Sequence, residues 1–105
     1  MQNRIEVFKQ MLEADPENTT VMFGLAKEYE KLGATAEIIE ILEKYISVAD
    51  DEGNAYGLLA EAYKQSGQRE KAVETFKEGI KVSLAHGHPT MASDYQMSLD
   101  MDFED

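Results

Sequence analysis

The sequence predicts an all-α protein, an antiparallel helical-hairpin solenoid made of half a repeat, two full repeats and a C-terminal capping segment. The first observation behind this prediction is an internal repeat, because residues 17–50 superpose on residues 51–84 at an offset of 34 residues. The second is the recurrence of apolar residues three and four positions apart, which is typical of amphipathic helices. The third is the placement of glycine and proline where these apolar stretches end. A hairpin of this length buries its apolar face only by stacking on a neighbour.

The identical residues of the two repeats fall on positions that pack or turn. They pair as Leu25 with Leu59, Ala26 with Ala60, Tyr29 with Tyr63, Gly33 with Gly67, Glu40 with Glu74, Ile46 with Ile80 and Val48 with Val82. Most of these residues are apolar, small or turn-forming, so the repeat reflects packing and not composition alone.

The first predicted helix covers residues 3–14 and is the half repeat. Ile5 and Leu12 fall where Ile39 and Ile46 stand one repeat later, so this segment matches the second helix of a hairpin. Pro16 ends it, because proline cannot continue a helix interior.

The two full repeats follow in order. The second predicted helix begins at a cap among residues 18–20 and ends at Gly33. The third occupies about residues 35–49, and the acidic stretch 50–53 then turns the chain and places negative charge at the N-terminus of the fourth. The fourth runs to about Gln65 and the fifth covers about 69–85. Pro89 suits the first position of a short sixth helix.

The C-terminal segment does not continue the repeat. Ser93 and Asp94 stand where Leu59 and Ala60 stand one repeat earlier, so the face that would form a third core is polar. Apolar residues four positions apart provide a stripe for a capping helix, namely Met91, Tyr95 and Leu99. From residue 96 onward apolar and acidic residues alternate, which favours an extended or disordered chain. We therefore predict a helical repeat domain over residues 1–96 and an acidic tail over residues 97–105.

The repeated residues resemble the tetratricopeptide repeat (TPR) motif, in which a large residue is followed by Leu, a small residue and Tyr, and later by a small and a large residue. The first copy reads Met22, Leu25, Ala26, Tyr29, Ile38 and Leu42, and the second reads Tyr56, Leu59, Ala60, Tyr63, Ala72 and Phe76. The second copy fits better, because Met22 replaces the usual aromatic residue and Ile38 the usual alanine of the first. The resemblance implies a non-catalytic protein-interaction fold.

Composition and charge narrow the classes of partner. The chain has no cysteine, which excludes disulfides and thiolate metal sites. Its net charge is −11, and such a field repels nucleic-acid phosphates and anionic membrane surfaces. There is no apolar stretch long enough to span a membrane. We expect no nucleic acid, no membrane and a cytoplasmic protein.

The sequence contains few candidates for metal-binding or catalytic residues. A pair of histidines, His86 and His88, followed by Asp94, is a weak candidate for a metal site, and the intervening Gly87 is typical of a helix end. The acidic pairs are predicted to lie on solvated faces, where nothing shifts their pKa toward that of a general acid. We expect no enzyme activity, no catalytic residues, no metal and no cofactor.

Binding is the class of function that remains, and the helical spacing predicts which residues face a partner. In proteins similar to this one the first helices of successive repeats line a concave groove, which here implies a protein or peptide partner. With the core positions assigned, the groove residues are expected to be Thr20, Phe23, Lys27, Glu30, Asn54, Gly57, Glu61, Lys64, Met91 and Tyr95.

Two residues of this groove have alternative interpretations. Phe23 is either an exposed anchor for a partner or packs on the N-terminal helix. Gly57 either leaves room for a partner or allows close packing of helices. The leading function is an adaptor that binds a peptide or helix in the groove. The alternative is a homo-oligomer, because the half repeat leaves Phe8 and its apolar neighbours without their usual cover.

Overall fold

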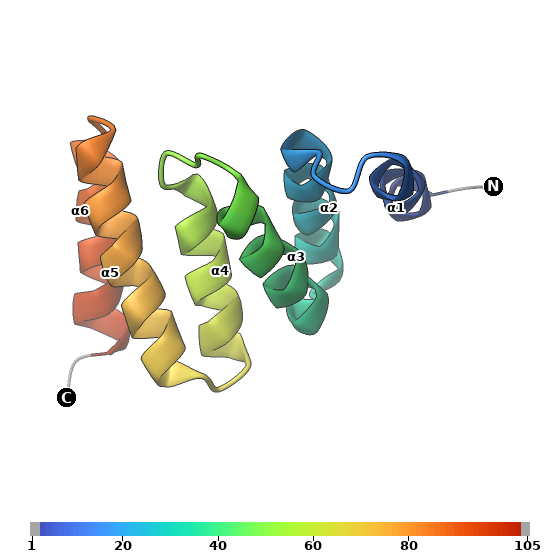
Figure 1. Ribbon diagram of the computed structural model, residues 1–105. Coiled ribbons are helices and arrows are strands. Elements are labelled where there is room, and N and C mark those ends of the chain that lie inside the picture. Colours follow the sequence, from blue (N-terminus) through green and yellow to red (C-terminus); the bar gives the residue numbers. More distant parts are fainter. Residues whose placement is uncertain (1–2, 104–105) are drawn as a thin grey trace. The chain divides into compact units, whose positions relative to one another are not determined.

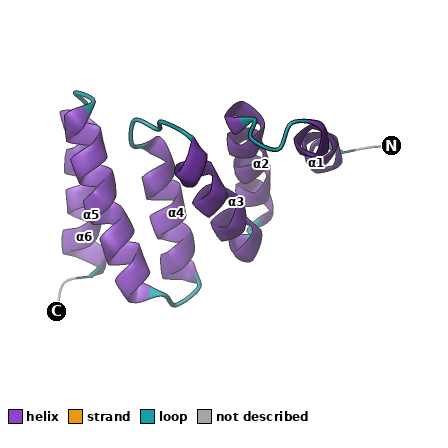
Figure 2. Ribbon diagram, viewed as in Figure 1, coloured by secondary structure: helices purple, strands orange, loops and turns teal. Residues whose placement is uncertain are grey.

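The protein is all-helical over residues 3–103, the part of the chain that the computed structural model describes (Figures 1 and 2). Six helices follow one another and no strand occurs within that range. The predicted fold class is confirmed. The helices divide into two compact units, residues 1–50 and 51–105, which are described in turn.

The first unit contains α1 (Arg4–Ala14), α2 (Thr19–Leu32) and α3 (Thr35–Val48). The side chain of Asn3 accepts a hydrogen bond from the Glu6 amide and caps α1, and Asn18 caps α2 by accepting from the Val21 amide. Gly33 ends α2 with a φ of 67°, a left-handed conformation that favours glycine. The helix boundaries predicted from the sequence are confirmed to within about one residue.

The core of the first unit lies between α2 and α3. Its buried residues are Val21, Met22, Leu25, Ala26, Ile38 and Leu42. Helix α1 packs on α2 through Phe8, whose ring covers the backbone at Gly24; a Cβ atom placed there would lie 3.3 Å from the ring. Phe8 is half-buried, and α2 covers the side of its ring that faces Gly24.

The second unit contains α4 (Asn54–Gln65), α5 (Arg69–Ala85) and α6 (Pro89–Asp102). The carboxylate of Asp51 accepts hydrogen bonds from the amides of Gly53 (2.8 Å) and Ala55 (3.0 Å), which places negative charge at the start of α4 as predicted. The turns after α4 and α5 contain Gly67 and Gly87, both with positive φ. The buried apolar residues of α4 and α5 are Ala55, Leu59, Ala60, Ala62, Tyr63, Ala72 and Phe76.

Helix α6 is longer than predicted. The expectation of an extended tail from residue 97 is wrong for residues 97–102, which are helical; residues 104 and 105 lie outside the described residues. Two of the alternating apolar residues belong to a longer stripe with a spacing of four. The stripe consists of Met91, Tyr95, Leu99 and Phe103, all of which are half-buried. Met97 and Met101 lie outside this stripe, and their side chains are 55% and 77% exposed.

Candidate functional site

The predicted groove residues lie on α2 of the first unit and on α4 and α6 of the second. On α2, Thr20, Lys27 and Glu30 are exposed. Lys27 and Glu30 form an ion pair of 2.9 Å across one turn of the helix, as the spacing i to i+3 allows.

Phe23 is half-buried and packs against an aromatic residue of the same unit. Its ring centroid lies 5.5 Å from that of Tyr45 on α3, in a tilted arrangement that aromatic pairs favour. Neither sequence interpretation named Tyr45 as its neighbour. Phe23 contributes to the predicted α2 face as one half of an aromatic pair.

The space beside Gly57 on α4 is occupied by Tyr95 of α6. A Cβ atom at residue 57 would lie 2.6 Å from the Tyr95 ring, and one at Gly79 on α5 would lie 3.0 Å from the same ring. The sequence interpretation in which Gly57 leaves room for close helix packing describes this arrangement. Tyr95 is half-buried and also lies 5.8 Å from the Phe76 ring.

The hydroxyl group of Tyr95 enters the first turn of α4. It accepts a hydrogen bond from the Gly57 amide (3.2 Å) and donates one to the Gly53 carbonyl (2.7 Å). In each of the other five helices the equivalent amide bonds directly to the carbonyl of its N-cap residue. Tyr95 therefore replaces an intrahelical bond with two bonds of its own. Partial burial raises the pKa of Tyr95 above its ordinary value of 10.0.

The far end of the α4 face is also engaged by α6. Lys64 forms an ion pair of 2.9 Å with Asp102, and Glu61 lies 3.9 Å from the same ammonium group. The Asp102 carboxylate raises the pKa of Lys64 because it stabilises the charged ammonium. Just beyond it, Arg69 lies over the Phe103 ring at 5.5 Å and donates a hydrogen bond to the Phe103 carbonyl.

Met91 lies at the other end of α6, beside Gly53. A Cβ atom at residue 53 would approach its sulfur to 2.9 Å, and Gly53 has a φ of 130° that side chains rarely adopt. Asn54 is exposed, and its carbonyl lies 3.4 Å from the Tyr95 hydroxyl. Of the predicted groove residues in the second unit, those that α6 contacts or supplies are Asn54, Gly57, Lys64, Met91 and Tyr95.

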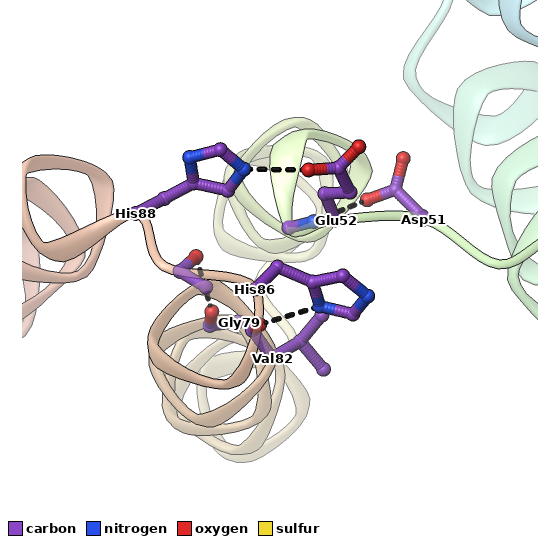
Figure 3. A network of polar contacts seen from close by, with 8 residues as sticks. Asp51, Glu52, Gly79, Val82, His86 and His88 are labelled. Atoms are coloured by element: carbon purple, nitrogen blue, oxygen red, sulfur yellow. Dashed lines mark hydrogen bonds and ion pairs between the residues drawn. The ribbon is translucent and has the colours of Figure 1, made fainter.

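The two histidines do not converge on a metal site. Nε2 of His88 lies 2.6 Å from the Glu52 carboxylate, and Nδ1 of His86 lies 2.9 Å from the Val82 carbonyl (Figure 3). The hydrogen bond from His88 lowers the pKa of Glu52. Among residues 3–103, no group of three or more histidine or acidic side chains is arranged to hold a metal ion.

The sequence interpretation missed two features of the first unit. The Glu28 carboxylate on α2 forms ion pairs with Lys31 (2.9 Å) and with Arg4 of α1 (3.5 Å). The hydrogen bond from Lys31 is the main cause of the lowered pKa of Glu28. The pairing of Arg4 with Glu28 joins two helices and so depends on packing that the sequence does not display.

The second missed feature is a hollow of about 330 Å³ among the three helices of the first unit. Tyr29, which the sequence assigns to the core, is only half-buried at its edge, whereas Tyr63 is 6% exposed. The lining residues are Lys9, Leu25, Tyr29, Glu37, Glu40, Ile41 and Lys44.

None of the described helices has both the length and the apolar character needed to cross a membrane.

Comparison with known proteins identifies one of the hairpins. The tetratricopeptide repeat family matches residues 53–86, which cover α4 and α5. No curated protein matches the chain.

Two crystal structures of MamA are similar to this chain, each with a TM-score of 0.72. They are 22% and 21% identical to it in sequence and cover 91% and 93% of its length. The chain spans only 64% and 62% of the two MamA chains. At this identity the similarity concerns the fold alone.

Proposed function

Because residues 53–86 form a tetratricopeptide repeat within an all-helical hairpin fold, we propose that the protein is a non-catalytic adaptor that binds a peptide or helix of a partner protein on the first helices of its hairpins. The observation that carries the proposal is the packing of α6 on α4. The face predicted to bind a partner already holds a helix of the same chain, through Gly57 and Lys64. The face of a first helix is therefore suited to packing against a helix, but on α4 this face is already occupied by α6.

The corresponding face of α2 supplies the exposed part of the proposed site. Thr20, Lys27 and Glu30 are exposed, and the Phe23 and Tyr45 rings are half-buried beside them. An apolar side chain of the partner packs on the aromatic pair, while its polar groups exchange with the ion pair of Lys27 and Glu30. Exposed ion pairs contribute at most about 1 kcal/mol each, so the aromatic contact carries most of the affinity.

Partner capture with surface variants tests this function. The protein is immobilised and its partners are identified by mass spectrometry, with Thr20→Lys and Lys27→Glu as groove variants and Lys44→Glu as the control. Lys44 is also exposed but lines the hollow of the first unit. We expect partners that are lost from both groove variants and retained by the control. Partners that bind all four proteins equally would contradict the proposed site.

Self-assembly is the second candidate, and the exposed apolar side of α1 favours it. Val7 and Met11 are 38% and 43% exposed, and Val7 borders a concavity with Asn3, Arg4 and Phe8. Sedimentation equilibrium over a wide range of concentration tests it. A dimer that Met11→Lys dissociates would support this alternative, and a monomer at every concentration would eliminate it.

A further inference from the structure

Helix α6 has a second face, opposite the stripe that packs on α5. We define the methionine face as the exposed residues Thr90, Ser93, Asp94, Met97 and Met101. At 100° per residue, the centre of this face points away from Tyr95 and Leu99. Its two methionines are the most exposed large apolar side chains of α6, at 55% and 77%.

The repeat register shows what this face corresponds to in a complete hairpin. Ser93, Asp94 and Met97 stand 34 residues after Leu59, Ala60 and Tyr63. Those three residues of α4 are buried, with exposures of 4%, 0% and 6%, in the face that packs on α5. The methionine face therefore occupies the position at which the first helix of a hairpin receives its second helix.

Charge determines which helix fits there. Helix α6 contains Asp94, Asp100 and Asp102 and no lysine or arginine. Asp102 is paired with Lys64, whereas Asp94 and Asp100 are exposed on either side of the two methionines. An apolar helix would desolvate both carboxylates without supplying an opposite charge, which costs free energy, and the neutral hydrogen bond that Asp100 accepts from Gln96 (3.0 Å) does not balance its charge. An acidic helix would be repelled.

We propose that the methionine face binds a basic amphipathic helix of another protein, which completes a third hairpin in trans. Apolar residues four positions apart on that helix pack on Met97 and Met101, whose flexible thioethers adapt to different partners. Lysine or arginine residues beside its apolar stripe pair with Asp94 and Asp100. This surface differs from the proposed groove, and its occupation requires no change in the contacts of Tyr95.

A synthetic peptide serves as the probe. It carries leucines four positions apart with flanking lysines, and two control peptides replace the lysines by glutamates or scramble the order of the basic sequence. Binding is followed by NMR of the methionine methyl groups in the complete chain. We expect the basic peptide to shift Met97 and Met101 while Met11, exposed on α1, and Met22, buried in the first core, stay unchanged.

A matched pair of variants tests the location. Met97→Lys is expected to weaken binding of the basic peptide by at least about tenfold, because it removes an apolar contact and repels the lysines. Leu32→Lys is the matched control and keeps the original affinity, because Leu32 is a 69% exposed apolar residue of α2 that belongs to no proposed binding surface. Asp94→Lys is expected to act in the same direction. Circular dichroism establishes that each variant remains helical.

Several outcomes would overturn the proposal. Equal affinity for the acidic or scrambled peptide would show that the face does not select a basic amphipathic helix. Equal binding by Met97→Lys, or methyl shifts at Met11, would place the peptide elsewhere. If sedimentation shows a dimer that Met97→Lys dissociates, the occupant is a second copy of this chain and not a basic partner.

Discussion

The two hairpins fill the same position in different ways. In the first, Phe23 of α2 and Tyr45 of α3 pack on each other with ring centroids 5.5 Å apart. The residues 34 positions later are Gly57 and Gly79, and the ring of Tyr95 lies against both. One hairpin thus supplies its own aromatic pair, whereas the other accepts a ring from the next helix. A glycine in the middle of a helix costs about 1 kcal/mol relative to alanine, and at these positions it creates the slot that Tyr95 occupies.

The largest effect is expected from Tyr95→Ala, which empties this slot. The variant loses the ring contacts with Phe76 and the two hydrogen bonds to α4, and we expect the free energy of unfolding to fall by about 2–3 kcal/mol. Chemical denaturation measures the loss. Hydrogen exchange should then show faster opening of α6 than of α2. Unchanged exchange in α6 would mean that Tyr95 does not hold this helix in place.

Gly57→Ala tests the slot from its other side. The added methyl group would lie 2.6 Å from the Tyr95 ring, so we expect a net loss of about 1–2 kcal/mol even though alanine is the better helix former. Gly24→Ala is the matched control in the first unit, because its methyl group would lie 3.3 Å from the Phe8 ring. Its expected change is within about 0.5 kcal/mol.

The two glycine variants also couple differently to Tyr95. In a double-mutant cycle, Gly57→Ala should lose most of its cost when Tyr95 is already alanine, whereas the effect of Gly24→Ala should not depend on Tyr95. Additive effects of Gly57→Ala and Tyr95→Ala would contradict a shared slot.

Most of the fold follows from local signals. Asn18, Gly33 and Pro89 mark helix ends through their own side chains and backbone preferences, so the sequence predicts these boundaries well. The end of α6 was predicted incorrectly. The apolar residues at positions 97, 99, 101 and 103 alternate with polar ones, as in an extended chain, but two of them also belong to the helical stripe with a spacing of four. Only the full stripe from Met91 to Phe103 distinguishes the helix from an extended chain.

The Tyr95 slot could not be predicted in the same way. It joins residues 38 positions apart in the chain, so no local pattern reports it. One signal was available: both members of the Phe23 and Tyr45 pair change to glycine in the second repeat. Two large-to-small changes at neighbouring positions of one hairpin indicate that another side chain fills the space. The adaptor site on α2 and α4 remains a prediction.

A smaller effect is expected from Tyr95→Phe, which keeps the ring and removes the hydroxyl group. We expect a loss of about 0.5–1.5 kcal/mol near neutral pH, at the lower end if the Gly57 amide then bonds to the Gly53 carbonyl as in the other helices. Thermal unfolding of the two proteins measures it. A loss as large as that of Tyr95→Ala would show that the ring itself contributes little.

Tyr95→Phe also tests how the stability of the protein depends on pH. Because the folded-state pKa of Tyr95 is raised, its contribution to stability is fully present below the ordinary value of 10.0 and is lost as the pH rises through the folded-state pKa. The wild type should therefore lose stability above pH 10 more steeply than Tyr95→Phe. Tyr56 and Lys64, whose pKa values are also raised, leave a residual slope in both proteins.

The smallest effect is expected at the exposed ion pairs, where the two units again differ. Lys64 pairs with Asp102 of another helix, whereas Glu30, which aligns with Lys64 one repeat earlier, pairs with Lys27 within α2. Asp102→Asn should therefore increase hydrogen exchange at the C-terminal turn of α6, while Glu30→Gln leaves the exchange of α2 nearly unchanged. The difference should shrink as salt is added, because exposed charges are screened. Equal exchange in α6 of Asp102→Asn and wild type at low salt would show that the Phe103 and Arg69 contact alone holds the end of this helix.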